Sequence, residues 1–202
     1  MEAFNIFNRA QLLGPQAVGG NIGTEVVACD INQQLVFDAS GLRMCSMKGS
    51  PKVLEELNQA LRDELTAINQ YFLHAEMSEN WGYKKYSQYI KKQSIDEMKH
   101  AELLMERIIF LDGSPKMEPM SLTIGKSVKE MIESDLKLEH EAVASYNKSI
   151  KVCVENADNG SRDLFVKLLR DEEGHVDWLE SQVHQIAEIG YERYLITQTE
   201  ED

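Results

Sequence analysis

The sequence predicts an all-α fold: a four-helix bundle of two antiparallel hairpins, joined by a long crossover and followed by a short fifth C-terminal helix. Three observations lead to this prediction. Apolar residues recur with helical spacing in four long segments. The breaks inside each pair of segments are short, whereas the break between the pairs is long. Residues 47–202 therefore form the bundle domain, and no strand is needed within it.

The first hairpin is predicted over residues 51–80 and 84–111. Pro51 stands in the first turn, where proline is favoured because the missing N–H has no partner there. A glycine and a proline end the second helix. The break around Trp81 is so short that the two helices should lie antiparallel.

The second hairpin is predicted over residues 127–155 and 162–188. Before it, residues 112–126 hold two prolines and two glycines and are long enough to run the length of a helix, which indicates a crossover. Ser161 is a plausible N-cap for the fourth helix. A glycine ends that helix, and residues 191–199 are expected to form the fifth.

Residues 1–46 differ from the rest, being rich in glycine, asparagine and glutamine without a helical period. They are interpreted as an N-terminal extension of low order, in which residues 25–29 and 34–37 could pair as a small hairpin. The extension is either an upstream read-through with a misjudged start or a genuine segment for assembly, docking or cargo loading.

The chain is strongly acidic, with a formal net charge of -13. Nucleic acid and anionic lipid would be repelled, so neither is expected as a partner, and cations are the natural ligands. The three cysteines form neither a disulfide framework nor a CxxC metal site, which favours a reducing cytoplasm. No apolar run approaches the ~20 residues of a membrane span, and an export signal is not apparent. We therefore expect a cytoplasmic protein.

The sequence Glu-x-x-His occurs twice, as Glu97/His100 in the second predicted helix and as Glu172/His175 in the fourth. One such pair alone is weak, because this spacing often arises by chance on helices. Two such pairs, one on the second helix of each predicted hairpin, are more informative.

Glu64 and Glu139 add an inward-facing acid on each of the other two helices, since both lie in the middle of apolar stripes. The intervals Glu64 to Glu97 and Glu139 to Glu172 are both 33 residues, and a tyrosine follows seven residues after Glu64 and after Glu139. The hairpins thus look like copies. An α-helix rises ~1.5 Å per residue, and the two glutamates of each hairpin lie at similar numbers of residues from the turn between them. All four acids are therefore expected at the same depth in the bundle.

Four buried carboxylates need positive charge beside them, because each would otherwise carry several kcal/mol of desolvation cost, roughly. Two divalent cations balance them, as do two trivalent ions with a bridging oxide. Oxygen and imidazole ligands without thiolate favour iron or manganese over magnesium, calcium or structural zinc. Iron is the leading prediction, and this ligand set is the one that ferritin-like di-iron bundles use.

From Met47 onward the sequence closely resembles bacterioferritin. The resemblance is carried by Met47-Lys-Gly, Asn69-Gln-Tyr-Phe-Leu-His-Ala, Ser94-Ile-Asp-Glu-Met-Lys-His-Ala, Asp171-Glu-Glu-Gly-His-Val-Asp-Trp-Leu-Glu and Gly190-Tyr-Glu-Arg-Tyr-Leu. It implies a ferritin-like fold and an iron-storing ferroxidase that oxidises Fe(II) to Fe(III) with O₂ or H₂O₂. It also implies dimers that assemble into a 24-subunit shell, and a ferredoxin-type reductant for iron release.

The resemblance also implies roles for individual residues. Two iron ions per subunit would be held by Glu64, Glu97, His100, Glu139, Glu172 and His175. Haem b would lie between two subunits, bound by Met98 of each. Tyr71 and Trp178 match residues that are thought to pass electrons near the site. From the residues alone, Met98 is read as a packing residue, since methionine commonly fills gaps, and haem ligation is favoured only through the resemblance. Packing in the core is equally compatible with the sequence for the two aromatic residues.

The sequence departs from the family at two positions. Lys92 stands where the family often has histidine, which argues against an auxiliary iron site on the inner surface, although its companion Asp96 is present. Leu104 replaces a second aromatic residue of some relatives, which weakens the expectation of a full radical relay.

Two alternative functions remain open at this point. One is another di-iron enzyme on the same bundle, either a peroxide reductase of the rubrerythrin kind or an oxygenase. Rubrerythrins usually carry CxxC knuckles, which this sequence lacks. The other is a non-catalytic, haem-binding subunit of the shell, against which the intact ligand set argues.

Overall fold

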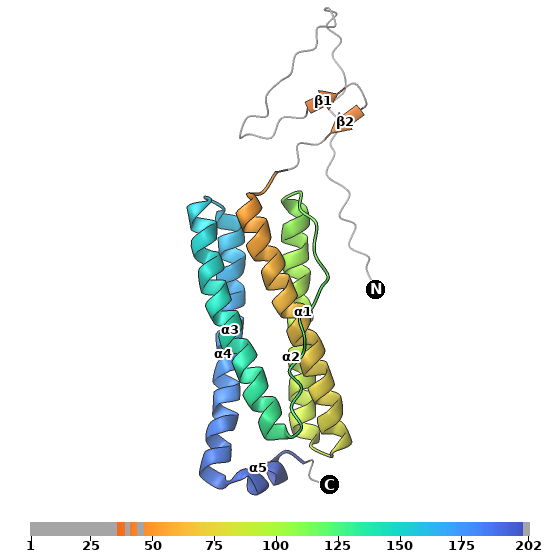
Figure 1. Cartoon of the computed structure of the whole chain (residues 1–202), viewed down its shortest axis with the longest axis vertical. Helices are drawn as coiled ribbons and strands as arrows, with labels where there is room; N and C mark the ends of the chain where they lie inside the picture. The colour runs from red at the N-terminus through yellow and green to blue at the C-terminus, as the bar shows by residue number, and fades with distance from the viewer. Residues whose placement is uncertain (1–35, 39–40, 44–46, 200–202) are drawn as a thin grey trace, which may run out of the picture. The chain divides into compact units, whose positions relative to one another are not determined.

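The computed structural model describes residues 36–38, 41–43 and 47–199, and its helices form a four-helix bundle with a crossover and a short fifth helix (Figure 1). The all-α prediction for the bundle is therefore confirmed. The helices are α1 (Pro51–Asn80), α2 (Lys84–Phe110), α3 (Val128–Glu155), α4 (Asn159–Ile189) and α5 (Tyr191–Thr197). Among the described residues, no helix is long and apolar enough to cross a membrane.

The chain divides into two units, residues 1–45 and residues 46–202, and each is described by itself. In the first unit, β1 (Val36–Asp38) pairs antiparallel with β2 (Gly41–Arg43). Of the hairpin expected from the sequence, residues 25–29 lie outside the described residues. The other stretch, residues 34–37, overlaps β1, whose described partner is β2.

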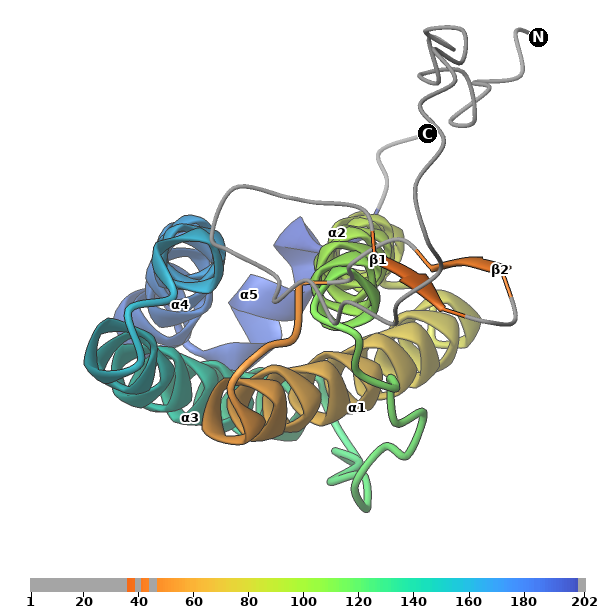
Figure 2. The ribbon, with the colours of Figure 1, turned by 90° about the horizontal axis from the view of Figure 1, so that it is seen from above.

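The helices of the second unit pack as two hairpins, α1 with α2 and α3 with α4, and α1 also packs against α3. Figure 2 shows the bundle end-on, with α2 and α3 on either side of α1 and with α4 beside α3. The backbones of α2 and α4 come close at fewer places than those of α1 and α3. Side chains fill the space between α2 and α4, among them Trp178 stacked on Tyr89 and His100 beside Glu172.

The N-terminus of α4 differs from the sequence prediction. Asp158, and not Ser161, is the N-cap, and the helix starts at Asn159. The Asp158 carboxylate accepts hydrogen bonds from the backbone N–H of Ser161 at 2.9 Å and from its hydroxyl at 2.8 Å. Asp158 also accepts from Arg107 of α2 at 2.6 Å. This tertiary contact favours the aspartate over the serine, both of which are good N-cap residues.

Two apolar clusters fill the bundle, one toward each end. The first includes Leu57, Leu61, Leu104, Ile108, Phe165 and Leu168. The second includes Tyr71, Tyr86, Ile90, Ile132, Leu179 and Tyr194. On every long helix a glutamate stands between the residues of the first cluster and those of the second. The core is thus divided by a polar layer.

The crossover runs beside α1 in an extended course (Figure 1). Side chains of α1 accept hydrogen bonds from its backbone N–H groups. The acceptors recur on one face of α1, four or eight residues apart. Asn58 accepts from Lys116 at 2.8 Å, Thr66 from Met120 at 2.8 Å, Gln70 from Thr123 at 2.9 Å and His74 from Gly125 at 3.1 Å. Side chains of α1 thereby replace the backbone partners that a strand or helix would have provided.

At the end of the crossover the chain passes very close to the first turn of α3. A Cβ atom on Gly125 would lie 2.4 Å from the backbone nitrogen of Met131, which no side-chain movement can relieve. Gly174 in α4 offers a contrast, because a Cβ there would meet nothing within 4 Å.

We predict that Gly125→Ala lowers the free energy of unfolding by about 1–3 kcal/mol, the usual range for overpacking. Gly174→Ala is the matched control and should raise it by about 0.5–1 kcal/mol, because alanine is the better helix former. Denaturant unfolding of the metal-free protein, followed by circular dichroism, measures both. Equal stability of the two variants would contradict the close approach at Gly125.

A candidate metal centre between the two hairpins

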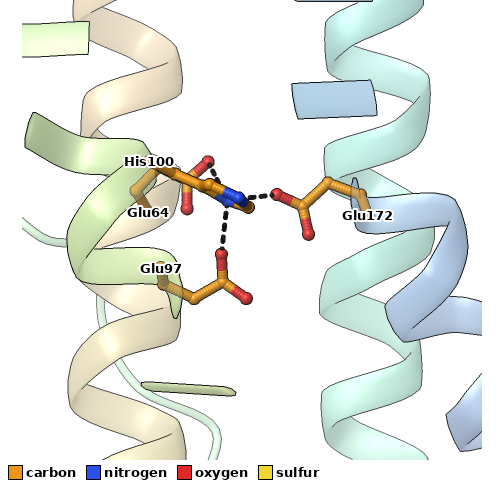
Figure 3. A group of neighbouring side chains, drawn as sticks. All are labelled: Glu64, Glu97, His100 and Glu172. Atoms are coloured by element: carbon orange, nitrogen blue, oxygen red, sulfur yellow. Dashed lines mark hydrogen bonds and ion pairs between the residues drawn. The ribbon is translucent and has the colours of Figure 1, made fainter. Parts of the chain in front are cut away.

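The six side chains predicted from the sequence meet in the polar layer of the bundle. Glu64 comes from α1, Glu97 and His100 from α2, Glu139 from α3, and Glu172 and His175 from α4. Their potential ligand atoms form two groups, in each of which all the atoms lie within 4.8 Å of one another. One group is Glu64, Glu97, His100 and Glu172, drawn in Figure 3, and the other is Glu97, Glu139, Glu172 and His175. Glu97 and Glu172 belong to both groups.

The two groups are arranged almost symmetrically. His100 Nδ1 lies 2.8 Å from Glu97 Oε2 and 3.1 Å from Glu172 Oε1. His175 Nδ1 lies 2.9 Å from Glu172 Oε2 and 3.0 Å from Glu97 Oε1. Each imidazole thus uses the same ring nitrogen and faces the same two carboxylates. This agrees with the equal 33-residue intervals in the sequence.

The layer is nearly closed to solvent, since each of the four glutamates is at most 3% exposed. Both oxygens of Glu97 and one oxygen of Glu172 make no hydrogen bond within the described part of the chain, although imidazole nitrogens are close. Buried polar atoms normally have partners. Buried carboxylate oxygens without hydrogen-bond donors are suited to binding cations.

Two tyrosines tie the hairpins together across the layer. The Tyr71 hydroxyl of α1 donates to Glu139 of α3, and the Tyr146 hydroxyl of α3 donates to Glu64 of α1. Burial, and then the neighbouring carboxylates, raise the pKa of both tyrosines well above the usual value. Sequence reasoning assigned Tyr71 to the site but gave Tyr146 no role. The signal was the tyrosine that follows each of the two glutamates after seven residues.

Without metal, protons supply the counter-charge of the layer. Burial acts to lower the pKa of His100, but the neighbouring carboxylates of Glu172, Glu64 and Glu97 outweigh it and raise this pKa to about 12. Burial also opposes the charged form of His175, yet Glu139, Glu172 and Glu97 raise its pKa strongly.

The carboxylates of the layer respond in two ways. Burial, followed by repulsion from Glu172, raises the pKa of Glu64 and of Glu139 well above the usual value. Burial would raise the pKa of Glu172 too, but the two neighbouring histidines lower it to about 2. The metal-free layer therefore holds two imidazolium groups beside an ionised Glu172.

Cavities reach the layer from two sides. The one between α1 and α3 is lined by Asp63, Met120 and Glu141 together with the buried glutamates. On the side of α2 and α4, a cavity of about 290 Å³ is lined by Asp96, Lys99, Lys167 and Asp171 together with the two histidines. His100 Nε2 faces Asp171 Oδ2 there at 3.5 Å.

The remaining predicted residues lie apart from the layer. Met98 stands on the outer face of α2 and is 47% exposed. Leu104 is fully buried in the first apolar cluster. Asp96 pairs with Lys99 at 2.7 Å. Lys92, at the position that departs from the family, is exposed. Trp178 packs against the second cluster, one helical turn beyond His175.

One buried pair of polar side chains was not predicted from the sequence. His74 and Asp135 are both fully buried, with His74 Nδ1 3.1 Å from an Asp135 oxygen. Because the Gly125 N–H donates to Nε2, the proton of a neutral His74 sits on Nδ1 and is donated to Asp135. Gln70 donates to the same carboxylate at 2.9 Å. Asp135 lies one turn before Glu139, so its position on the buried face of α3 was the available signal.

Comparison with known proteins places these features in context. Residues 54–189 match the Ferritin family, described as a ferritin-like domain. The chain is similar to bacterioferritin of Brucella melitensis biotype 1, with 50% identity over 73% of this chain and 92% of that protein. It is also similar to bacterioferritins of Mycolicibacterium paratuberculosis (42% identity, 73% of this chain and 94% of that protein) and Streptomyces coelicolor (42%, 77% and 93%).

We predict that divalent ions displace protons from this layer. Each imidazole that binds an ion through Nδ1 releases one proton, so a pair of ions releases at least two from His100 and His175. Affinity must then fall as the pH falls, and the product of the two binding constants should change by at least about 100-fold per pH unit. Calorimetric titration with Co²⁺ in buffers of different ionisation enthalpy counts the protons. Binding without proton release would contradict the protonation described above.

Proposed function

The chain belongs to the bacterioferritin family of ferritin-like proteins, and on that basis we propose that it stores iron and oxidises Fe(II) to Fe(III) as a ferroxidase. One observation supports this most strongly: six ligand-type side chains from all four long helices meet in a buried layer as two groups that share Glu97 and Glu172. The layer accommodates two ions side by side. Iron is the substrate and cargo, and O₂ or H₂O₂ is the oxidant.

The residues of the layer divide into shared and separate ligands. Glu97 and Glu172 serve both ions, since each lies within reach of both histidines. Glu64 and Glu139 serve one ion each and are held in place by the tyrosines of the opposite hairpin. Asp171 Oδ2 lies 3.5 Å from the outer nitrogen of His100, where a carboxylate can help to orient the ring, as carboxylates commonly do beside metal-bound histidine.

The chain contributes charge, shape and protons to the reaction. The net charge of -13 attracts Fe²⁺ toward the protein. Four carboxylates favour the higher charge of Fe³⁺, and the closed layer keeps bulk water away from the oxidant. The acidic residues Asp63 and Glu141 line the approach between α1 and α3. Bound iron supplies one electron per ion to the oxidant.

We predict that Glu64→Gln and Glu139→Gln each slow the initial oxidation of Fe(II) by at least about tenfold, because even partners of metal ligands contribute about 10–100-fold. Glutamine preserves the side-chain shape but removes the charge. Stopped-flow absorbance after mixing Fe(II) with metal-free protein and O₂ gives the rates. Glu180→Gln on the α4 surface, 59% exposed, is the control and should oxidise iron normally. A Glu64→Gln protein as fast as this control would refute the proposed ligands.

Haem b, shared between two subunits, is the second cofactor that we propose. Met98 presents an exposed thioether on α2, and Ile95, one turn away on the same face, is exposed as well. An exposed thioether with an apolar neighbour on the same face fits a porphyrin that would take one methionine from each subunit. Haem would supply one-electron transfer for iron release, with a ferredoxin-type protein as the reductant.

We predict that Met98→Leu abolishes most of the Soret absorption, because the substitution would remove the thioether with which each subunit would hold the haem. The spectrum of the purified, haem-saturated protein is the measurement. Met117→Leu, at a methionine of the crossover that is 58% exposed, serves as the control. A Met98→Leu protein with the Soret band of the control would exclude methionine ligation.

We further propose that dimers of this chain assemble into a 24-subunit shell in the cytoplasm. Large apolar side chains are exposed on α1 and α2, among them Phe72, Ile95 and Phe110. Exposed apolar side chains of this size on neighbouring helices are typical of protein interfaces. Residues 47–202 would build the shell.

A further inference from the structure

The cavity between α1 and α3 brings a methionine of the crossover together with the metal layer. Its volume of about 50 Å³ holds molecules of the size of water. The lining includes the buried Glu64 and Glu139 of the layer and also Met120, which is 39% exposed. Among the lining residues that the structure describes, Met120 alone carries sulfur. The cavity therefore connects the layer to a thioether that also reaches solvent.

The backbone of the crossover is fixed to α1 at this methionine. The Met120 N–H donates to Thr66 Oγ1 at 2.8 Å, and the Thr66 hydroxyl donates to the carbonyl oxygen of Arg62 at 2.7 Å. Thr66 is buried, and the next residue, Ala67, lines the cavity. Pro119 limits the backbone directly before the methionine, because its ring fixes φ. The place of Met120 beside the cavity is thus set by α1.

Met120 and Tyr146 are the readily oxidised side chains among the described residues of the lining. Tyr146 donates its hydroxyl to Glu64, so its oxidation would disturb a carboxylate of the layer. Met120 belongs to the crossover and supplies no ligand atom to the layer. Oxidation of a thioether gives a sulfoxide, which dedicated reductases convert back. Of the two side chains, Met120 is the one whose oxidation leaves the layer intact.

We propose that Met120 is an oxidation site of this protein, at which oxidant leaving the metal layer through the cavity between α1 and α3 is consumed by forming methionine sulfoxide. The inference rests on the proposed binding and oxidation of iron in the layer. It concerns the oxidant that remains when this reaction is incomplete.

The step occurs when H₂O₂ meets a layer that holds one Fe(II) instead of two. The iron gives one electron to H₂O₂, whose O–O bond breaks to give hydroxide and a hydroxyl radical. The radical adds to the sulfur of Met120. O₂ then takes one electron from this adduct, and the S–OH proton leaves and joins the hydroxide as water. The sum is Fe²⁺ + H₂O₂ + R–S–R′ + O₂ → Fe³⁺ + H₂O + R–S(O)–R′ + O₂•⁻.

A second methionine in the same peptide provides an internal control. Trypsin releases residues 117–126, which contain Met117 and Met120, and fragment masses show which sulfur carries the added oxygen. Met117 lies in the same crossover and is 58% exposed, but it lies outside the lining of the cavity. The ratio of oxidised Met120 to oxidised Met117 therefore separates oxidant from the cavity from oxidant in bulk solvent.

We predict that this ratio depends on where the radical forms. In one reaction, full-length protein holding one Fe(II) per subunit is mixed with H₂O₂ in aerated buffer. In the other, metal-free protein receives the same H₂O₂ with Fe(II)–EDTA, which forms the radical in bulk solvent. The ratio should be at least about tenfold higher with iron in the layer, because so reactive a radical attacks the groups nearest to it. Equal ratios in the two reactions would overturn the proposal.

Two alanine substitutions on α3 test the route through the cavity. Ala142 lines the cavity, and leucine there fills part of its space. Ala142→Leu should therefore lower the ratio measured with iron in the layer by at least about threefold. Ala144→Leu, at an exposed position of the same helix, is the matched control and should keep the ratio of the parent. An unchanged ratio in Ala142→Leu would overturn the route.

The stopped-flow reaction of two Fe(II) per subunit with O₂ tests the ferroxidase proposal separately. Rapid oxidation of iron by a parent protein that shows equal methionine ratios would overturn the role of Met120 alone. A parent protein that oxidises iron no faster than buffer does would instead refute the ferroxidase proposal, whatever the methionine ratio.

Discussion

The cost of keeping four carboxylates away from water governs the rest of this structure. Glu64, Glu97, Glu139 and Glu172 are each at most 3% exposed and lie between two apolar clusters. Such a layer would be strongly destabilising without compensating charge. In the metal-free protein the protonated histidines provide part of that charge. The raised pKa of Glu64 and of Glu139 reflects the cost of burial and repulsion that remains. The cations that we propose would take the place of these protons and offset the same cost.

Side chains of each hairpin contact carboxylates of the other, so the polar layer depends on the whole bundle. Tyr71 of α1 holds Glu139 of α3, and Tyr146 of α3 holds Glu64 of α1. The two metal-ligand groups share Glu97 and Glu172, which come from different hairpins. Neither hairpin alone presents a complete group. The near-symmetry of the sequence is therefore used to build one centre, in which each half completes the other.

Most of the fold and the six clustered residues could be predicted from the sequence, because helical periodicity and the equal 33-residue intervals fix depth and direction along each helix. Contacts between helices were harder to predict. The cap at Asp158 depends on Arg107 of α2, and the pairing of His74 with Asp135 depends on how α1 and α3 lie together. Rotation and sliding of one helix against another leave no periodic pattern in the sequence, so these contacts needed coordinates.

The crossover shows how tightly a segment without regular structure can be constrained in length. Between Asn58 and Thr66 the helix α1 rises ~12 Å at 1.5 Å per residue. The matching amides, on Lys116 and Met120, are four residues apart and reach at most ~14 Å when fully stretched. The segment from Lys116 to Met120 is therefore almost fully extended, and deleting one of its residues would break one of the two hydrogen bonds. In evolution, this connector should resist deletion as firmly as the helix it follows.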